Sequence, residues 1–316
     1  MFEKFDFNTI NNELDIVALK NYSYLDHKFL ITDTKLTIKN FEKKKSIDEI
    51  KDEIIKNSLF FLYFETDDKY IYHLDKIINY QGKFIIHKNY NKNNYIHTNQ
   101  FCKLALQSTY RKRHSISHFN EIVHGNICQA IEQTKHLDGD YVEIGVYKGG
   151  SALTALNYMK YSGIKKKSYF LDTFDGFDYE EAIKSSETHW EKNNEHHKLW
   201  GPEKTIEIIN NLLKNQCPNQ DFELIQNNIC NQQLPSSIKK IAVANVDVDL
   251  YDASIIAFNK VAEKIVKGGI IIAEDPPATP ALIGAYYAME KFLKTDMGKK
   301  FMKLHLLGQY FLIKIE

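Results

Sequence analysis

Acidic side chains follow two apolar runs in the C-terminal half of the sequence. The runs are residues 241–246 and 270–273, and the acids after them are Asp247, Asp249, Glu274 and Asp275. Parallel strands joined by a helical crossover end at the same edge of a sheet, so up to four carboxylates are expected to converge there. Two unit charges ~4 Å apart repel by roughly 4 kcal/mol at an effective dielectric constant of 20, so the pattern favours a bound cation.

A glycine-rich turn and a further acid follow two earlier predicted strands. In EIGVYKGGSA the glycines are Gly145, Gly149 and Gly150, and a helix begins near Ser151. Such a turn lets a ligand approach the backbone, although a tight connection without a ligand explains it equally well. In FLDTFDGF, Asp172 ends its strand and is placed to bind the hydroxyls of a ribose. The glycine turn and Asp172 together predict a nucleoside cofactor. The G-x-x-x-G-G spacing of the turn argues against NAD.

Alternating strands and helices from residue 139 onward must position these residues. The expected strands are residues 141–146, 168–171, 222–225, 241–246 and 270–273, and the expected helices are residues 151–160, 203–214, 253–267 and 282–293. A terminal antiparallel pair, residues 301–307 and 309–315, turns at Gly308. This order predicts an α/β fold with a doubly wound, mostly parallel sheet and a C-terminal antiparallel hairpin.

The first 100 residues contain a separate pattern. Ser46 and Glu49 form a predicted capping box for a helix over residues 47–56. Residues 59–64, 69–80 and 83–87 have the pattern of a strand, a helix and a second strand, and the stretch 88–100 is rich in asparagine, as linkers are. We therefore expect a smaller α/β accessory domain with its linker over residues 1–100, of unassigned function, and a second domain over residues 101–316.

Composition restricts the function classes. The 316 residues carry a formal net charge of 0, which gives no global field for nucleic acid or an anionic membrane. No apolar run approaches the ~20 residues of a membrane span, and the N-terminus lacks a signal-peptide pattern. The four cysteines have no metal-ligand spacing and suit a reducing compartment. The expected location is cytoplasmic.

Four motifs resemble those of a known family. The series YVEIGVYKGGSA, FLDTFDGF, NVDVDLYDAS and KGGIIIAEDPP, in this order, is similar to the macrocin (macrolide sugar) O-methyltransferases, which are class I, Rossmann-like enzymes that use S-adenosylmethionine. The resemblance covers roughly residues 120–316. It implies methyl transfer to a hydroxyl of a sugar, a glycoside or another polyhydroxylated small molecule, and it favours a homo-oligomer.

The resemblance also implies roles for individual residues. Those assigned to the cofactor are Glu143, Gly145, Gly149, Gly150 and Ser151 at the methionine part, Asp172 at the ribose, and Gln226 and Asn227 in the loop beside the adenine. The acids implied to hold Mg²⁺ are Asp247, Glu274 and Asp275. Glu274 stands at a position where the family usually has aspartate, so the side chain that carries the carboxylate is longer here. Asp249 is either a fourth acid or an anchor of its turn.

A general base is expected in the insertion over residues 179–200. His189 is the first choice for removing the acceptor's proton, with His196 and His197 as alternatives, and a surface role for each histidine stays open. Together with Asp247, His189 forms the expected catalytic pair. Three other functions also stay open at this point: methyl transfer to a phenol, an amine or a phosphorylated group, an NAD-dependent oxidoreductase, and a binding or scaffolding module without catalysis.

Overall fold

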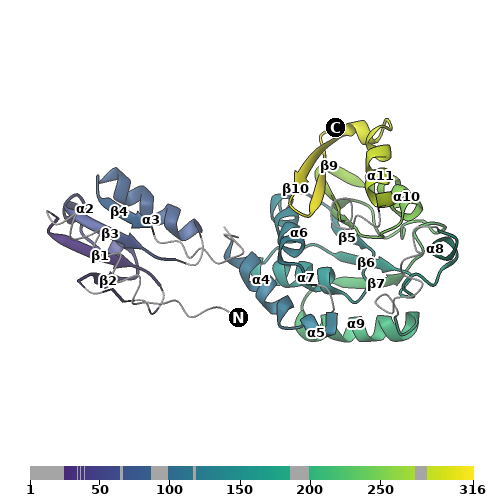
Figure 1. Cartoon of the computed structure of the whole chain (residues 1–316), viewed down its shortest axis with the longest axis horizontal. Coiled ribbons are helices and arrows are strands. Elements are labelled where there is room, and N and C mark those ends of the chain that lie inside the picture. Colours follow the sequence, from purple (N-terminus) through teal and green to yellow (C-terminus); the bar gives the residue numbers. More distant parts are fainter. Residues whose placement is uncertain are drawn as a thin grey trace. The chain divides into compact units, whose positions relative to one another are not determined.

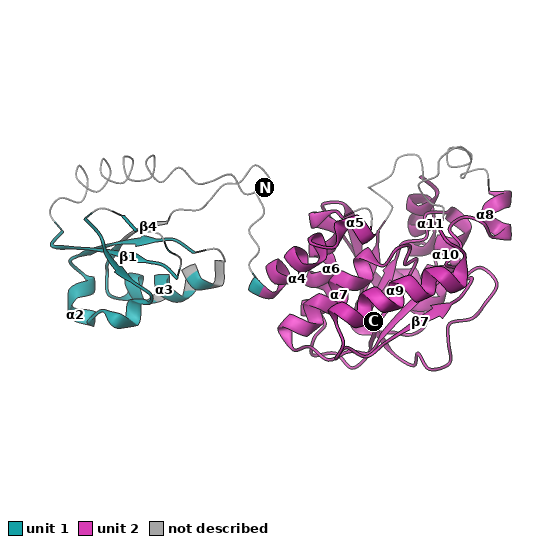
Figure 2. Cartoon of the chain, turned by 90° about the horizontal axis from the view of Figure 1, so that it is seen from below, with its two compact units in different colours: residues 1–100 teal, residues 101–316 magenta. Residues whose placement is uncertain are grey.

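The chain divides into two compact units, Met1–Gln100 and Phe101–Glu316 (Figure 2). A computed structural model describes residues 25–33, 35, 37–38, 40–64, 67–86, 99–116, 119–185, 199–274 and 283–316. Among these residues no helix combines the length and the apolar character needed to cross a lipid bilayer.

The C-terminal unit is built on a seven-stranded sheet in the order β10-β11-β9-β8-β5-β6-β7. Its strands are β5 (Asp140–Ile144), β6 (Ser168–Asp172), β7 (Phe222–Gln226), β8 (Ile241–Val246), β9 (Ile265–Ala273), β10 (Phe301–Leu306) and β11 (Gln309–Lys314). Strands β5 to β9 run parallel, whereas β11 pairs antiparallel with β9 and with β10. The predicted fold class is confirmed. Chain order reverses between β5 and β8, and ligands of open α/β sheets bind at such switch points.

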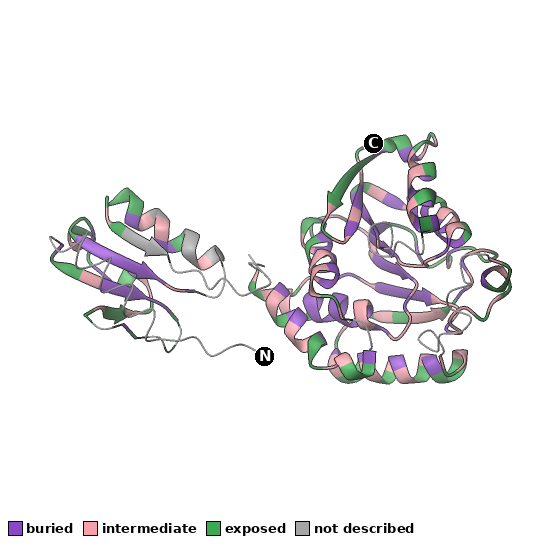
Figure 3. Ribbon diagram, in the orientation of Figure 1, coloured by how far each residue is buried: buried purple, intermediate pink, exposed green. Residues whose placement is uncertain are grey.

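Helices cover both faces of this sheet (Figure 1). One face packs against α4 (Gln100–Tyr110), α6 (Glu121–Gln133), α7 (Gly150–Ser162) and α9 (Pro202–Gln216), and the other against α10 (Tyr251–Ala262) and α11 (Ile283–Leu293). Two short helices, α5 (Arg113–Ile116) and α8 (Glu180–Lys184), lie in the connections. Every residue of β8 is buried, so the central strands form the core of the unit (Figure 3).

The helix predicted over residues 253–267 is wrong in its last part. Helix α10 ends at Ala262, and β9 begins already at Ile265 and continues through Gly268 and Gly269. β-Branched residues at the start of β9 favour the strand, and the glycines accommodate an irregularity in its pairing with β8. The two glycines therefore interrupt a strand rather than end a helix.

The N-terminal unit contains a parallel four-stranded sheet in the order β2-β1-β3-β4. Its elements are β1 (His27–Ile31), β2 (Glu42–Lys44), η1 (Ile47–Glu49), α2 (Asp52–Ile55), β3 (Ser58–Leu62), α3 (Asp67–Asn79) and β4 (Lys83–Ile86). The capping box of Ser46 and Glu49 is present, but the single helix predicted over residues 47–56 is split into η1 and α2. Strands β1 and β2 were not predicted.

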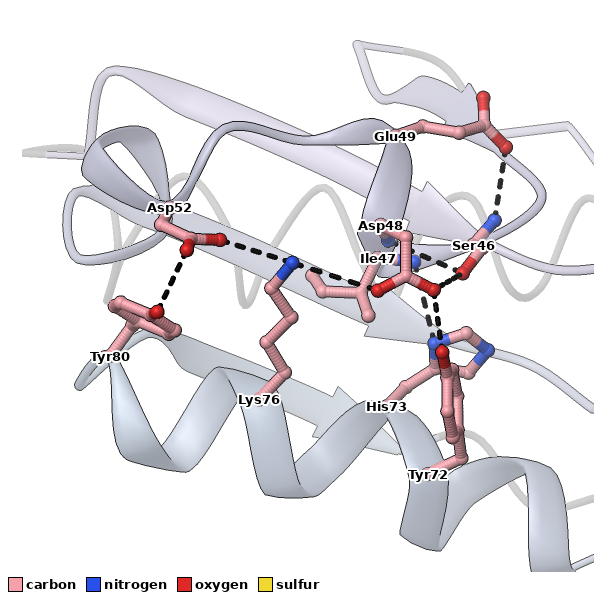
Figure 4. Close-up of polar contacts among 9 residues, drawn as sticks. All are labelled: Ser46, Ile47, Asp48, Glu49, Asp52, Tyr72, His73, Lys76 and Tyr80. Carbon is pink, nitrogen blue, oxygen red and sulfur yellow. Dashed lines mark hydrogen bonds and ion pairs between the residues drawn. The ribbon is translucent and has the colours of Figure 1, made fainter.

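Side chains of α3, together with Tyr80 directly after it, contact both of these short helices (Figure 4). The hydroxyl of Tyr72 donates to Asp48 at 2.6 Å, and that of Tyr80 donates to Asp52 at 2.7 Å. Lys76, one helical turn from each tyrosine, lies 3.0 Å from the Asp52 carboxylate. These contacts are exposed, so each adds little stability, but together they orient η1 and α2.

Candidate active site

Backbone hydrogen bonds hold the ends of four neighbouring strands together. The amide of Asp247 donates to Ile144 at 2.9 Å, and the amide of Glu274 donates to Val246 at 3.1 Å. The amide of Gly145 donates to Leu171 at 2.9 Å. The loops after β5, β6, β8 and β9 therefore open at one edge, where they surround a cavity of about 390 Å³.

The polar wall of this cavity is acidic. Its lining includes Asp172, Asp247, Asp249 and Glu274, and the part of the chain that the structure describes contributes no lysine or arginine to it. Burial, and next the neighbouring Glu274 carboxylate, raise the pKa of Asp247 well above its usual value. Asp247 and Glu274 were predicted to follow two separate strands, and the structure brings both into this wall. Such a group of carboxylates favours a cationic occupant.

The turn after β5 passes unusually close to the loop after β8. Gly145 has φ +91°, and a Cβ atom on it would lie 1.6 Å from the carbonyl oxygen of Asp247. Two residues later, Tyr147 has φ +50°, which is uncommon for an aromatic residue. Strained backbone of this kind persists where surrounding contacts enforce it, and it clusters at ligand sites. Only glycine fits at position 145.

Asp172 holds this turn in place. Its Oδ2 accepts hydrogen bonds from the amides of Val146 at 2.6 Å and Tyr147 at 2.9 Å. Its Oδ1 accepts from the Phe174 amide at 2.8 Å and from the Thr173 hydroxyl at 3.3 Å. A carboxylate has about four acceptor positions, and all are engaged here. Contact with a ribose hydroxyl, the predicted role, would have to displace the Thr173 hydroxyl.

Replacing Asp172 with alanine is expected to lower the free energy of unfolding by roughly 2–4 kcal/mol, because the Val146 and Tyr147 amides lose a charged acceptor. Asp172→Asn keeps one acceptor oxygen and is expected to cost about half as much. Urea denaturation of the three proteins measures the difference. Equal stability of all three would show that the turn holds its shape without the carboxylate.

Glu143 lies beneath the cavity floor instead of lining it. The side chain is buried, and its carboxylate accepts hydrogen bonds from the Tyr141 hydroxyl at 2.8 Å and the Ser151 hydroxyl at 2.7 Å. Burial raises the pKa of Glu143 to about 7. Ser151 itself lines the cavity, so the glutamate orients a hydroxyl whose lone pairs remain available to a ligand.

The macrocin-O-methyltransferase (TylF) family model matches residues 74–307. The chain belongs to this family. The match confirms the resemblance seen in the motifs and extends it upstream into α3. The protein is therefore an O-methyltransferase, which sets aside the oxidoreductase and the non-enzymatic module.

Solved structures share the fold at low sequence identity. The O-methyltransferase NovP has a TM-score of 0.53 and 14% identity, over 69% of this chain and 97% of NovP. CalS11, a calicheamicin methyltransferase, has a TM-score of 0.46 and 16% identity, over 72% of this chain and 98% of CalS11. The similarity to NovP supports the fold alone. No curated protein sequence matches this chain.

Several residues predicted for this O-methyltransferase line its cavity. Those with a cofactor assignment are Gly145, Gly150, Ser151, Asp172 and Asn227. Gly149 instead precedes α7 in a left-handed conformation, and Gln226 lies in a second hollow beside Trp200. Asp275 and the histidines at 189, 196 and 197 lie outside the described residues. Among the described residues, no group of three or more histidine, cysteine or acidic side chains is arranged to hold a metal.

Sequence reasoning missed several polar residues of the cavity wall, among them His124 and Asn245. His124 on α6 is buried, with its Nδ1 2.5 Å from the Thr154 hydroxyl, and burial lowers its pKa to about 4. Asn245 is buried in β8. The signal for Asn245 was present, because an asparagine interrupts the apolar run IAVANV. His124 gave no such signal, because histidine is intermediate between the residue types that are mostly buried and those that are mostly exposed.

Proposed function

We propose that this O-methyltransferase transfers a methyl group from S-adenosylmethionine to a hydroxyl of a sugar or another polyhydroxylated small molecule, and that it requires Mg²⁺. The acidic cavity wall, without lysine or arginine from the described residues, is the observation that carries the cofactor assignment. S-adenosylmethionine brings a sulfonium and an ammonium, which carboxylates attract, whereas the diphosphate of a dinucleotide would be repelled.

The strand ends support a placement for the cofactor. Gly145, Gly150 and Ser151, from the turn after β5, would face its methionine part. Asn227 follows β7 on the other side of β6, and its Oδ1 is buried without a hydrogen-bond partner among the described residues. An acceptor at that position suits the exocyclic amino group of adenine.

Asp247 and Glu274 would hold Mg²⁺ together with Asp275. The fit rests on chemistry, because carboxylate oxygens are the ligands that Mg²⁺ prefers and the two described acids already face one another. Mg²⁺ held there would supply the Lewis acidity that makes the acceptor hydroxyl easier to deprotonate. Asp249, with φ +63°, would support the turn that presents Asp247. His189 would accept the acceptor's proton.

Calorimetry with two ligands and a turnover assay with and without divalent metal test this proposal. S-adenosylhomocysteine is expected to bind the purified protein with a micromolar Kd, and NAD is expected not to bind. Removal of divalent metal with EDTA is expected to abolish methyl transfer to sugar acceptors, and added Mg²⁺ is expected to restore it. Binding of NAD without S-adenosylhomocysteine would refute the cofactor, whereas full turnover in EDTA would refute only the metal.

A further inference from the structure

Asn245 is a polar residue in an otherwise apolar, fully buried strand. It occupies the fifth position of β8, and its side chain is 0% exposed. Its neighbours across the sheet are Glu143 on β5 and Ile272 on β9. Residues paired in this way share a face, so the amide lies beside the Glu143 carboxylate on the side of the sheet that α6 and α7 cover. Asn245 also lines the cavity.

The amide of Asn245 has unused hydrogen-bonding capacity. Neither its Oδ1 nor its Nδ2 makes a hydrogen bond of normal geometry with any described residue. Its side chain is nevertheless close enough to Glu143 to lower the pKa of that carboxyl. Because Asn245 is paired with Glu143 across the sheet, its Nδ2 group is the donor that suits this carboxylate, and Oδ1 then has no donor among the described residues. An unsatisfied buried acceptor destabilises a fold, and an occupant of the cavity that Asn245 lines can supply the donor.

The groups around the Oδ1 atom of Asn245 restrict which donor can bind to it. The Ser151 hydroxyl lines the cavity, and because it donates its proton to Glu143 at 2.7 Å it presents lone pairs to the cavity. Asp247 lies two residues beyond Asn245, at the end of the same strand. A group that binds among these acceptors must carry several N–H donors, and a positive charge favours it further. In S-adenosylmethionine only the α-ammonium meets both conditions, because the sulfonium has no proton to donate.

We propose that Asn245 is a cofactor-binding residue whose Oδ1 accepts a hydrogen bond from the α-ammonium of S-adenosylmethionine. The inference rests on the proposed cofactor and adds the residue that recognises its amino-acid end. Asn245 then contributes to binding rather than to folding: the strand carries an unsatisfied amide without the ligand and a satisfied one with it.

Asn245→Leu tests this role because it keeps the approximate volume and removes the amide. The probes are S-adenosylhomocysteine and its deaminated analogue, in which hydrogen replaces the α-amino group. We expect the Kd of S-adenosylhomocysteine to rise roughly 10- to 100-fold, the loss of one charge-assisted hydrogen bond, and the Kd of the analogue to stay unchanged. The unliganded variant is expected to melt at the wild-type temperature or above it.

Asn157→Leu is the matched control. Asn157 is also a buried asparagine, but its side chain is satisfied. Its Nδ2 donates a hydrogen bond to the Thr109 hydroxyl at 3.2 Å, and its Oδ1 accepts one from the Cys217 thiol at 3.4 Å. That variant is expected to melt at a lower temperature and to show no discrimination between the two probes. Asn245→Ala serves if the leucine variant does not fold.

Three outcomes would overturn the inference. An unchanged Kd for S-adenosylhomocysteine in Asn245→Leu would do so, as would an equal loss for both probes, which is the result expected if a resident water satisfies the amide. If Asn245→Leu melts at a lower temperature and still distinguishes the two probes as the wild type does, Asn245 has a structural role. Failure of the wild-type protein to bind S-adenosylhomocysteine would instead refute the proposed function itself.

Discussion

Asp247→Ala is expected to lower the rate of methyl transfer by roughly 1,000-fold or more while S-adenosylhomocysteine still binds. The proposed Mg²⁺ contributes several kcal/mol to the transition state, and each 1.36 kcal/mol corresponds to a factor of ten in rate. Asp247 faces Glu274 closely, so removing either carboxylate leaves too few ligands for the metal. Glu274→Ala is expected to have the same effect, measured as turnover against Mg²⁺ concentration.

The unliganded stability of these variants separates a metal site from a structural pair. Two adjacent carboxylates without a cation repel one another, and burial adds to the strain by raising the pKa of Asp247. Asp247→Ala should therefore melt at a higher temperature than the wild type in EDTA, and Mg²⁺ should stabilise the wild type only. A variant that loses activity, loses stability in EDTA and responds to Mg²⁺ like the wild type would refute the metal assignment.

The acids at the strand ends were predictable because strand topology is strongly constrained. Apolar runs of strand length, separated by a helical crossover, place Asp247 and Glu274 at one edge without knowledge of any side-chain contact. The cavity lining includes both residues, as well as Gly145, Gly150 and Ser151 from the glycine turn. Local sequence and chain order were sufficient for this part of the site.

Contacts between distant segments were not predictable. The engagement of Asp172 by the Val146 and Tyr147 amides depends on how far the turn after β5 leans toward β6. The unsatisfied amide of Asn245 depends on which residue of β5 lies beside it, and that register follows from a bulge between β5 and β8. Strands β1 and β2 were missed for a related reason: β2 has only three residues, all charged, and is defined by its pairing with β1.

Gly145→Ala is expected to reduce both stability and cofactor binding more than other glycine substitutions in this unit. The positive φ of +91° alone disfavours an L-residue, and the new methyl group would lie 1.6 Å from the Asp247 carbonyl oxygen. One of the two backbone segments must therefore move. The movement would break the hydrogen bond from Gly145 to Leu171 at 2.9 Å, or the one from Asp247 to Ile144 at 2.9 Å.

Gly163→Ala is the matched control for this substitution. Gly163 has a similar φ of +75°, but a Cβ atom there would meet nothing within 4 Å. Its cost is the backbone penalty alone, about 1–2 kcal/mol, whereas the clash at Gly145 adds a further ~1–3 kcal/mol. Urea denaturation measures both, and calorimetry with S-adenosylhomocysteine is expected to show weaker binding only for Gly145→Ala. Equal losses of stability with unchanged affinity would mean that the two loops separate easily, and the close approach at Gly145 would then not be what holds Asp247 at the cavity.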